Sequence, residues 1–133
     1  MAQCGDSFTY VLRGTYFDWG RVRYTDTREP IAGEGYIPIS AEDARAFNIL
    51  NHHGTNGEDI LGLNIFRCRS ADGLFSGRLL AQGNQHDPRY AKQFSVQGSL
   101  KPLGRWYQDI GAHAGDQFLV RWESGTDIVI EKL

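Results

Sequence analysis

The feature that most constrains the fold of this 133-residue chain is a series of short segments in which polar and apolar residues alternate. Residues 7–12 (SFTYVL) show this pattern with aromatic and β-branched side chains, which is typical of a half-buried strand. Further strand-like segments, separated by turn residues, are predicted at 36–39, 61–69, 74–81, 90–96, 117–123 and 127–131. Seven short strands with mostly hairpin connections predict a mainly β fold, a closed or partly closed barrel, in a single domain over residues 1–133.

The connections between these segments carry residues with particular backbone preferences. Residues 71–73 (ADG) contain the Asp-Gly pair that supplies the positive φ angles of a tight hairpin. Residues 124–126 (SGT) predict the turn of a closing hairpin. Pro38 has no amide hydrogen to donate, so we expect its segment at an edge of the sheet.

Two short helices are predicted between strands. Ser40 is a typical N-cap, and an acid at the third helical position can bond back to it. This helix is expected to end near Phe47 or Ile49, with Ala44 and Phe47 facing inward. Ser99 predicts the cap of a second helix, whose apolar residues recur at three- and four-residue spacing: Leu100, Leu103, Trp106 and Tyr107.

Composition is that of an ordinary globular protein, with 41% hydrophobic and 23% charged residues. No apolar run is long enough to span a bilayer and no signal pattern opens the chain, so we expect a cytoplasmic protein without a membrane partner. Cys4 and Cys68 have no second pair with which to form a metal quartet. A disulfide between them is one alternative; a terminal free thiol and a thiol buried in a strand is the one that we expect.

Charge is unevenly distributed, although the net charge is only −2. Residues 19–28 hold three arginines against one aspartate, a local balance of +2. Residues 78–105 have a balance of +4, since Asp87 is opposed by five cations: Arg78, Arg89, Lys92, Lys101 and Arg105. On an otherwise acidic chain, two basic segments predict two contact surfaces for an anion. Solvated loops with chance charge are the alternative.

No catalytic constellation is recognisable in the sequence. The Asp…Glu-x-Lys pattern of metal-dependent nucleases is missing, because Glu131 and Lys132 are adjacent. Phosphate-loop and nucleophile-elbow motifs are also missing. Residues 51–53 (NHH) are expected in an exposed loop, and His113 in a structural turn. We therefore expect a chain that is not itself an enzyme and that has no catalytic residue, metal or cofactor.

Several short motifs resemble a known family in their order and spacing. The motifs that carry this resemblance are 19–23 (WGRVR), 28–30 (REP), 35–39 (GYIPI), 92–94 (KQF), 98–100 (GSL), 103–104 (LG) and 115–116 (GD). With them, the chain resembles the C-terminal DNA-binding region of NgoFVII- and BfiI-like restriction endonucleases. That family is similar in fold to the EcoRII effector domain and the plant B3 domain. The resemblance implies a B3-like pseudobarrel with seven strands and two helices, which clamps the DNA major groove between two arms.

The resemblance implies that the N-arm, residues 19–28, lies between the first two strands. For Trp19 we expect a core anchor at the base of this arm and not a contact with DNA. Arginine offers a donor fork for guanine or phosphate, hydroxyl groups suit phosphates or a thymine methyl, and aspartate accepts from cytosine. The predicted N-arm contacts of these three kinds are Arg21, Arg23, Arg28, Tyr24, Thr25, Thr27 and Asp26.

The C-arm, residues 82–93, is the hairpin between two middle strands. Asn84 and Gln85 present the donor and acceptor that match adenine, while Tyr90 and Lys92 are suited to the DNA backbone. The other predicted C-arm contacts are Gln82, His86, Asp87, Arg89 and Gln93. Ordinary turn chemistry is the alternative for Asn84, Gln85 and Asp87. Lys101 and Arg105 are expected to be phosphate contacts or solubility charges.

These inferences predict sequence-specific recognition of double-stranded DNA by a monomer, over about five or six base pairs, since two arms cover about half a helical turn. The parent protein would be a type II restriction endonuclease with a separate nuclease domain. Three alternatives stay open. They are a small barrel that binds single-stranded nucleic acid, a nuclease with an unrecognised metal site, and a protein-interaction domain. Stacking on single strands needs exposed aromatics, whereas Phe66, Phe94, Phe118 and Trp122 are expected in the core.

Overall fold

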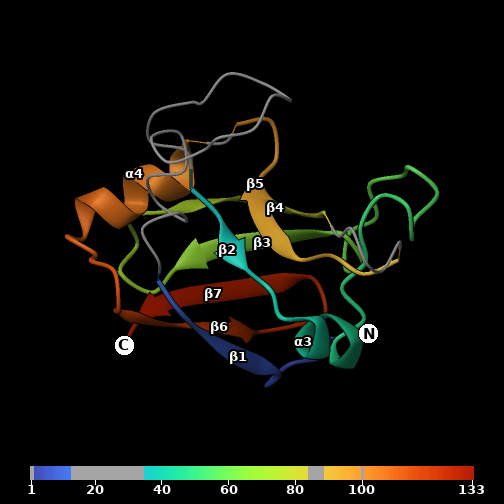
Figure 1. Ribbon diagram of the computed structural model, residues 1–133, viewed down its shortest axis with the longest axis horizontal. Coiled ribbons are helices and arrows are strands. Elements are labelled where there is room, and N and C mark those ends of the chain that lie inside the picture. Colours follow the sequence, from blue (N-terminus) through green and yellow to red (C-terminus); the bar gives the residue numbers. More distant parts are fainter. Residues whose placement is uncertain (1, 13–34, 84–88, 100) are drawn as a thin grey trace.

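The computed structural model describes residues 2–12, 35–83, 89–99 and 101–133 (Figure 1). Its seven strands form one mixed sheet that curls into a nearly closed barrel, with two short helices, as predicted. The strands are β1 (Ser7–Val11), β2 (Ile37–Pro38), β3 (Ile65–Ser70), β4 (Ser76–Gln82), β5 (Gln93–Val96), β6 (Gln117–Trp122) and β7 (Asp127–Lys132). The helices are α3 (Ala41–Ala46) and α4 (Pro102–Asp109).

The strand order is β1-β6-β7-β3-β4-β5-β2. Among the described strands, β3 and β7 run parallel and the other neighbours are antiparallel. The two sheet edges, β1 and β2, face each other across an unsealed seam, where a pocket of about 420 Å³ separates Thr9 and Val11 from Pro38. Pro38 therefore lies at an edge, as its missing amide hydrogen predicted.

Aromatic side chains fill the barrel in two adjoining groups. Trp122 contacts Phe8, Phe47 and Phe66, with ring centroids 5.4–6.0 Å apart. The second group surrounds Phe118 and includes Tyr10, Trp106 and Tyr107. All four aromatics predicted for the core are fully buried: Phe66, Phe94, Phe118 and Trp122. Losing one such side chain typically costs about 3–5 kcal/mol, so these rings dominate the stability of the barrel.

The prediction for α3 is confirmed in its cap and its buried face. The Ser40 hydroxyl accepts a hydrogen bond from the Asp43 backbone N–H (3.0 Å) and donates one to its carboxylate (2.9 Å). Ala44 is fully buried and Phe47, the C-cap, packs against the core. The helix thus ends at Ala46, at the short end of the predicted range.

The predicted Ser99 cap of α4 is wrong. The helix begins at Pro102, whose missing N–H and fixed φ suit the first helical position, and Lys101 is the N-cap. The Ser99 hydroxyl instead accepts from the Lys101 backbone N–H, one residue before the helix (3.4 Å). Leu103, Trp106 and Tyr107 are buried as predicted, whereas Leu100 lies outside the described residues.

Three strands start two to four residues later than predicted, after side-chain-bonded turns or an isolated bridge. Before β3, the buried Asn64 accepts from the Ile60 N–H (2.7 Å) and donates to the Glu58 carbonyl (3.1 Å). Before β4, the Asp72 carboxylate accepts from the N–H of the exposed Leu74 (2.8 Å). Before β5, Tyr90 makes an isolated bridge to Leu50 instead of joining the strand.

The turns and cysteines follow the sequence expectations. Gly73 has a φ of +78° in the hairpin between β3 and β4, as the Asp-Gly pair predicted. Cys4 is exposed, Cys68 is buried in β3, and both are free thiols. In the described ranges, neither helix is long and apolar enough to cross a membrane.

Candidate nucleic-acid interface

Many of the predicted DNA contacts lie outside the described residues. They are the seven N-arm residues Arg21, Arg23, Tyr24, Thr25, Asp26, Thr27 and Arg28, together with Asn84, Gln85, His86 and Asp87 of the C-arm. Trp19, the expected anchor of the N-arm, also lies outside them. The structure describes the other C-arm contacts, Gln82, Arg89, Tyr90, Lys92 and Gln93, and the residues that flank both arms.

The described segments on either side of residues 13–34 are called the N-arm root. A buried chain of hydroxyl groups joins them to α4. Tyr107 donates to the Tyr36 carbonyl (2.9 Å), and its oxygen lies 2.8 Å from the Tyr10 hydroxyl. Since a tyrosine has one hydroxyl hydrogen, Tyr10 is the donor in the second bond. Burial, followed by the neighbouring Tyr107, raises the pKa of Tyr10 well above its ordinary value, so this hydroxyl stays protonated. The chain links the two segments that flank the N-arm, one from β1 and one before β2.

Gly35, the first described residue after the 13–34 gap, lies directly against α4. A Cβ atom at Gly35 would come within 2.4 Å of the Gly104 backbone nitrogen and 2.8 Å of its Cα. No side chain fits in that space. The absence of a side chain at Gly35 therefore allows the backbone before β2 to lie directly against α4.

The root of the C-arm is fixed at the last rung of the β4–β5 ladder. Gln82 pairs with Gln93, and the Lys92 backbone joins two neighbouring strands. Its N–H donates to the Gln82 carbonyl (3.1 Å), and its carbonyl accepts from the Ile39 N–H (2.8 Å). The Lys92 side chain is exposed, and its methylene groups pack over Gly83, where a Cβ would lie 3.0 Å from Cε. Lys92 is thus held at its backbone and presents its ammonium group to solvent.

A loop that the sequence did not associate with binding supports the other side of this root. The Asn51 N–H donates to the Arg89 carbonyl (3.0 Å), and its side-chain amide donates to the Tyr90 carbonyl (3.2 Å). Gly54 packs so closely that a Cβ would lie 2.6 Å from the Arg89 oxygen. The Arg89 guanidinium lies 5.9 Å from the centre of the Tyr90 ring, within the range of a cation–π contact. The sequence signal that could have indicated this supporting role is the Asn and Gly of residues 51–54. The same residue types are common in any loop, so the signal is not specific.

The two roots lie at opposite ends of β5. Gly35 is three residues before Pro38, which pairs with Gln93, so the roots are roughly 10 Å apart along the strand. Figure 1 shows α4 at one end of the barrel and the loop that contains residues 51–54 (green) at the other, with β2 and β5 between them.

Between the roots, the outer face of β4 and β5 carries a polar groove. Arg78, Leu80 and Gln82 point outward from β4, where Leu80 pairs with Ser95 and Gln82 with Gln93. A pocket of about 380 Å³ extends from Gln82 to Lys101. It adjoins, at Ser99 and Lys101, a second pocket of about 490 Å³ beside Arg105 and Trp106 of α4.

The basic side chains of the described residues fall into two classes. On β3, Arg67 makes a two-pronged contact with Asp127 (2.8 and 3.1 Å), and Arg69 pairs with Glu123 (2.5 Å). The hydrogen bond from Arg67 holds the pKa of Asp127 far below its ordinary value. By contrast, no acidic partner within the described ranges lies within 4.0 Å of five exposed cations: Arg78, Lys92, Lys101, Arg105 and Arg121. Arg121 lies on β6, and the other four belong to β4, to the C-arm root and to α4.

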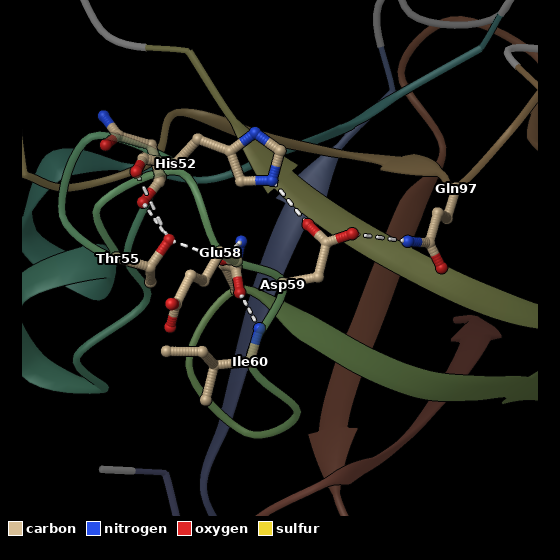
Figure 2. Close-up of polar contacts among 8 residues, drawn as sticks. His52, Thr55, Glu58, Asp59, Ile60 and Gln97 are labelled. Atoms are coloured by element: carbon tan, nitrogen blue, oxygen red, sulfur yellow. Dashed lines mark hydrogen bonds and ion pairs between the residues drawn. The ribbon is translucent and has the colours of Figure 1, made fainter.

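The Asp59 carboxylate lies near the end of β5, where it contacts His52 and Gln97 (Figure 2). His52 Nε2 lies 2.5 Å from Asp59 Oδ1, and the Gln97 amide donates to the other carboxylate oxygen (3.0 Å). His52 and His53 are exposed, as predicted for this loop. Gln97 follows β5 directly, so these contacts join the loop to the end of that strand.

The described residues contain no group of three or more His, Cys, Asp or Glu side chains placed to hold a metal ion. His113 is exposed in a turn, where its N–H donates to the Asp116 carboxylate (2.8 Å). No family model, curated protein or solved structure matches this chain. Its resemblance to restriction-endonuclease recognition domains therefore stays a prediction.

Proposed function

We propose that this chain is a sequence-specific, double-stranded DNA-binding domain that holds the major groove between the N-arm and the C-arm. The observation that carries the proposal is the separation of the basic side chains into two classes. Arg67 and Arg69 on β3 are paired with acids, whereas four other cations are exposed without an acidic partner in the described part of the chain: Arg78, Lys92, Lys101 and Arg105. Their charge is therefore available to phosphate groups.

The positions of the arm roots support the same proposal. The roots are roughly 10 Å apart along the strand, and the major groove of B-DNA is about 12 Å wide. Each root is fixed by buried contacts or backbone hydrogen bonds, so the side chains of the arms start from defined positions. Pre-organised roots of this kind reduce the entropy lost when an interface forms.

The single-strand alternative is less well supported. Sequence-tolerant stacking needs exposed aromatic rings beside a basic groove. The outer face of β4 and β5 has no aromatic ring among its described side chains, which are Ser76, Arg78, Leu80, Gln82, Gln93 and Ser95. Phe94 of the same strand is fully buried in the barrel. We also propose that the domain binds as a monomer in the cytoplasm and that a separate domain of a parent restriction endonuclease cuts the DNA.

The test is a selection of bound duplexes from a random pool, followed by measurement of affinity by fluorescence anisotropy. We expect one enriched motif of about five or six base pairs, and weaker binding to each separated strand. Arg23→Ala should reduce the preference for the motif, whereas Lys92→Ala should weaken all duplexes alike and reduce the salt slope by about 0.9.

Arg121→Ala is the matched control, because Arg121 is exposed on β6, a strand that pairs with β1 and β7 and not with β4 or β5. It should leave affinity and salt slope unchanged. Equal binding of duplex and single strands, or no enriched motif, would contradict the proposal. So would equal effects of Arg121→Ala and Lys92→Ala.

A further inference from the structure

We propose that the pocket between Gln82 and Lys101 binds one phosphodiester group of the DNA backbone, between the two arms. This inference rests on the proposed function and adds a contact whose charge, that of Lys101, comes from neither arm. It would place the duplex against the outer face of β4 and β5, so that the barrel itself takes part in binding.

The pocket combines apolar walls with a small set of converging polar groups. Its volume is about 380 Å³, and Leu80 and Val96 form part of its wall. The polar side chains that line it are the amide of Gln82, the hydroxyls of Ser95 and Ser99, and the ammonium of Lys101. All four can donate a hydrogen bond to an anionic oxygen, and none of them is negatively charged.

Ser95 is the most informative of these residues. It is 1% exposed and lies on the outer side of β5, opposite Leu80, since its neighbour Phe94 points into the core. Ser95 lines the pocket, and its hydroxyl makes no hydrogen bond to a described residue. A ligand in the pocket can therefore accept a hydrogen bond from this hydroxyl without displacing a described protein partner.

Lys101 supplies the charge and lies at the start of α4. It is the N-cap residue and makes no side-chain capping bond, and no acidic partner of its side chain lies within 4.0 Å in the described part of the chain. The positive end of the helix dipole lies at this terminus, where it adds to the ammonium charge. Asp109, which lines the adjoining pocket, lies at the other end of α4.

Free phosphate offers the same oxygen atoms as a backbone phosphodiester. We assign the pocket to the backbone because it lies between the arm roots and on the outer face of β4, which also carries the exposed Arg78. A bound duplex could therefore reach it without any change in the barrel.

The experiment is a double-mutant cycle between Lys101 and single phosphates of the selected duplex. Each phosphate in turn is replaced by an uncharged methylphosphonate, and affinities are measured for the wild type and for Lys101→Met. At one position the substitution should weaken wild-type binding by roughly five-fold at about 0.15 M salt, the value for one phosphate contact. At that position it should have no further effect on Lys101→Met, whose salt slope should already be lower by about 0.9.

Ser95→Ala separates a binding role from a structural one. Removing a buried hydroxyl that makes no hydrogen bond to a described residue should leave the free energy of unfolding unchanged or raise it, while weakening duplex binding by roughly ten-fold. Arg121→Ala, on β6, is again the control and should change neither quantity. Inorganic phosphate is the second probe, and it should compete with the duplex only at high concentration.

The outcomes distinguish this inference from the proposed function. If the wild type binds a selected duplex but Lys101→Met keeps the same affinity, slope and methylphosphonate profile, the pocket assignment is wrong and the function stands. Saturable binding of inorganic phosphate without competition against the duplex would also overturn the assignment. If the wild type binds no duplex at all, both proposals fail together.

Discussion

The buried hydroxyl chain at the N-arm root makes a sharp prediction about stability. Tyr10 donates to Tyr107, which donates to the Tyr36 carbonyl. The side chains of Tyr10 and Tyr107 are both at least nine-tenths buried. Tyr107→Phe keeps the ring and its contact with Phe118 but removes the central oxygen of the chain. Tyr10→Phe removes only the outer donor and leaves the bond from Tyr107 to Tyr36 in place.

The two substitutions should therefore differ in cost. A typical hydrogen bond contributes about 1 kcal/mol, and a buried polar group that loses its partner adds about 1–3 kcal/mol. Tyr10→Phe should lower the free energy of unfolding by about 1 kcal/mol. Tyr107→Phe removes both bonds of the hydroxyl chain and takes away the acceptor of the Tyr10 hydroxyl, so its cost should be about 3–5 kcal/mol.

Urea unfolding followed by tryptophan fluorescence measures both costs, because Trp106 and Trp122 belong to the same core. The double variant is the decisive sample. Once Tyr107 is Phe, replacing Tyr10 removes a buried hydroxyl without a partner, so the second change should cost nothing or restore stability. Additive costs, or equal costs of the two single variants, would refute a chain in which Tyr10 donates to Tyr107 and Tyr107 to Tyr36.

Three further predictions concern other parts of the barrel. Gly35→Ala should destabilise the fold by at least about 1–3 kcal/mol in thermal or urea unfolding, because its Cβ would lie 2.4 Å from a backbone nitrogen of α4. Arg67 lowers the pKa of Asp127, so the stability that this pair contributes is complete above about pH 4 and is lost as the pH falls further. In a plot of the free energy of unfolding against pH, Asp127→Asn should therefore reduce the slope below about pH 4. Burial raises the pKa of Cys68, so a thiol reagent at pH 8 should label Cys4 alone in the folded protein and both cysteines after unfolding.

Controls are available within the chain for these predictions. Gly77→Ala is the match for Gly35→Ala, since a Cβ at Gly77 would make ordinary contacts of 3.6 Å or more, and stability should change little. An acid limb that is the same in the wild type and Asp127→Asn would contradict the second prediction. Rapid labelling of Cys68 in the folded protein would contradict the third.

Local signals in the sequence were sufficient for much of the fold. The alternation in residues 7–12 predicted β1 to within one residue, because a strand with one buried face must place apolar side chains at every second position. Ser40 and the acid three residues later predicted the start of α3, since capping depends on neighbours in the chain. Prediction failed where a side chain acts on a turn, as Asn64 does before β3, because its partners are chosen by packing.

The candidate site divides in the same way. The sequence by itself determined where the cations lie along the chain and which segments connect the strands. It did not distinguish Arg67, which is paired, from Arg78, which is exposed without an acidic partner in the described ranges, because both are arginines in strands. The tertiary structure decided this, since the parallel pairing of β3 with β7 brings Asp127 to Arg67 from sixty residues away. A charge is available for binding only where folding brings no opposite charge to it, and that depends on contacts between distant parts of the chain.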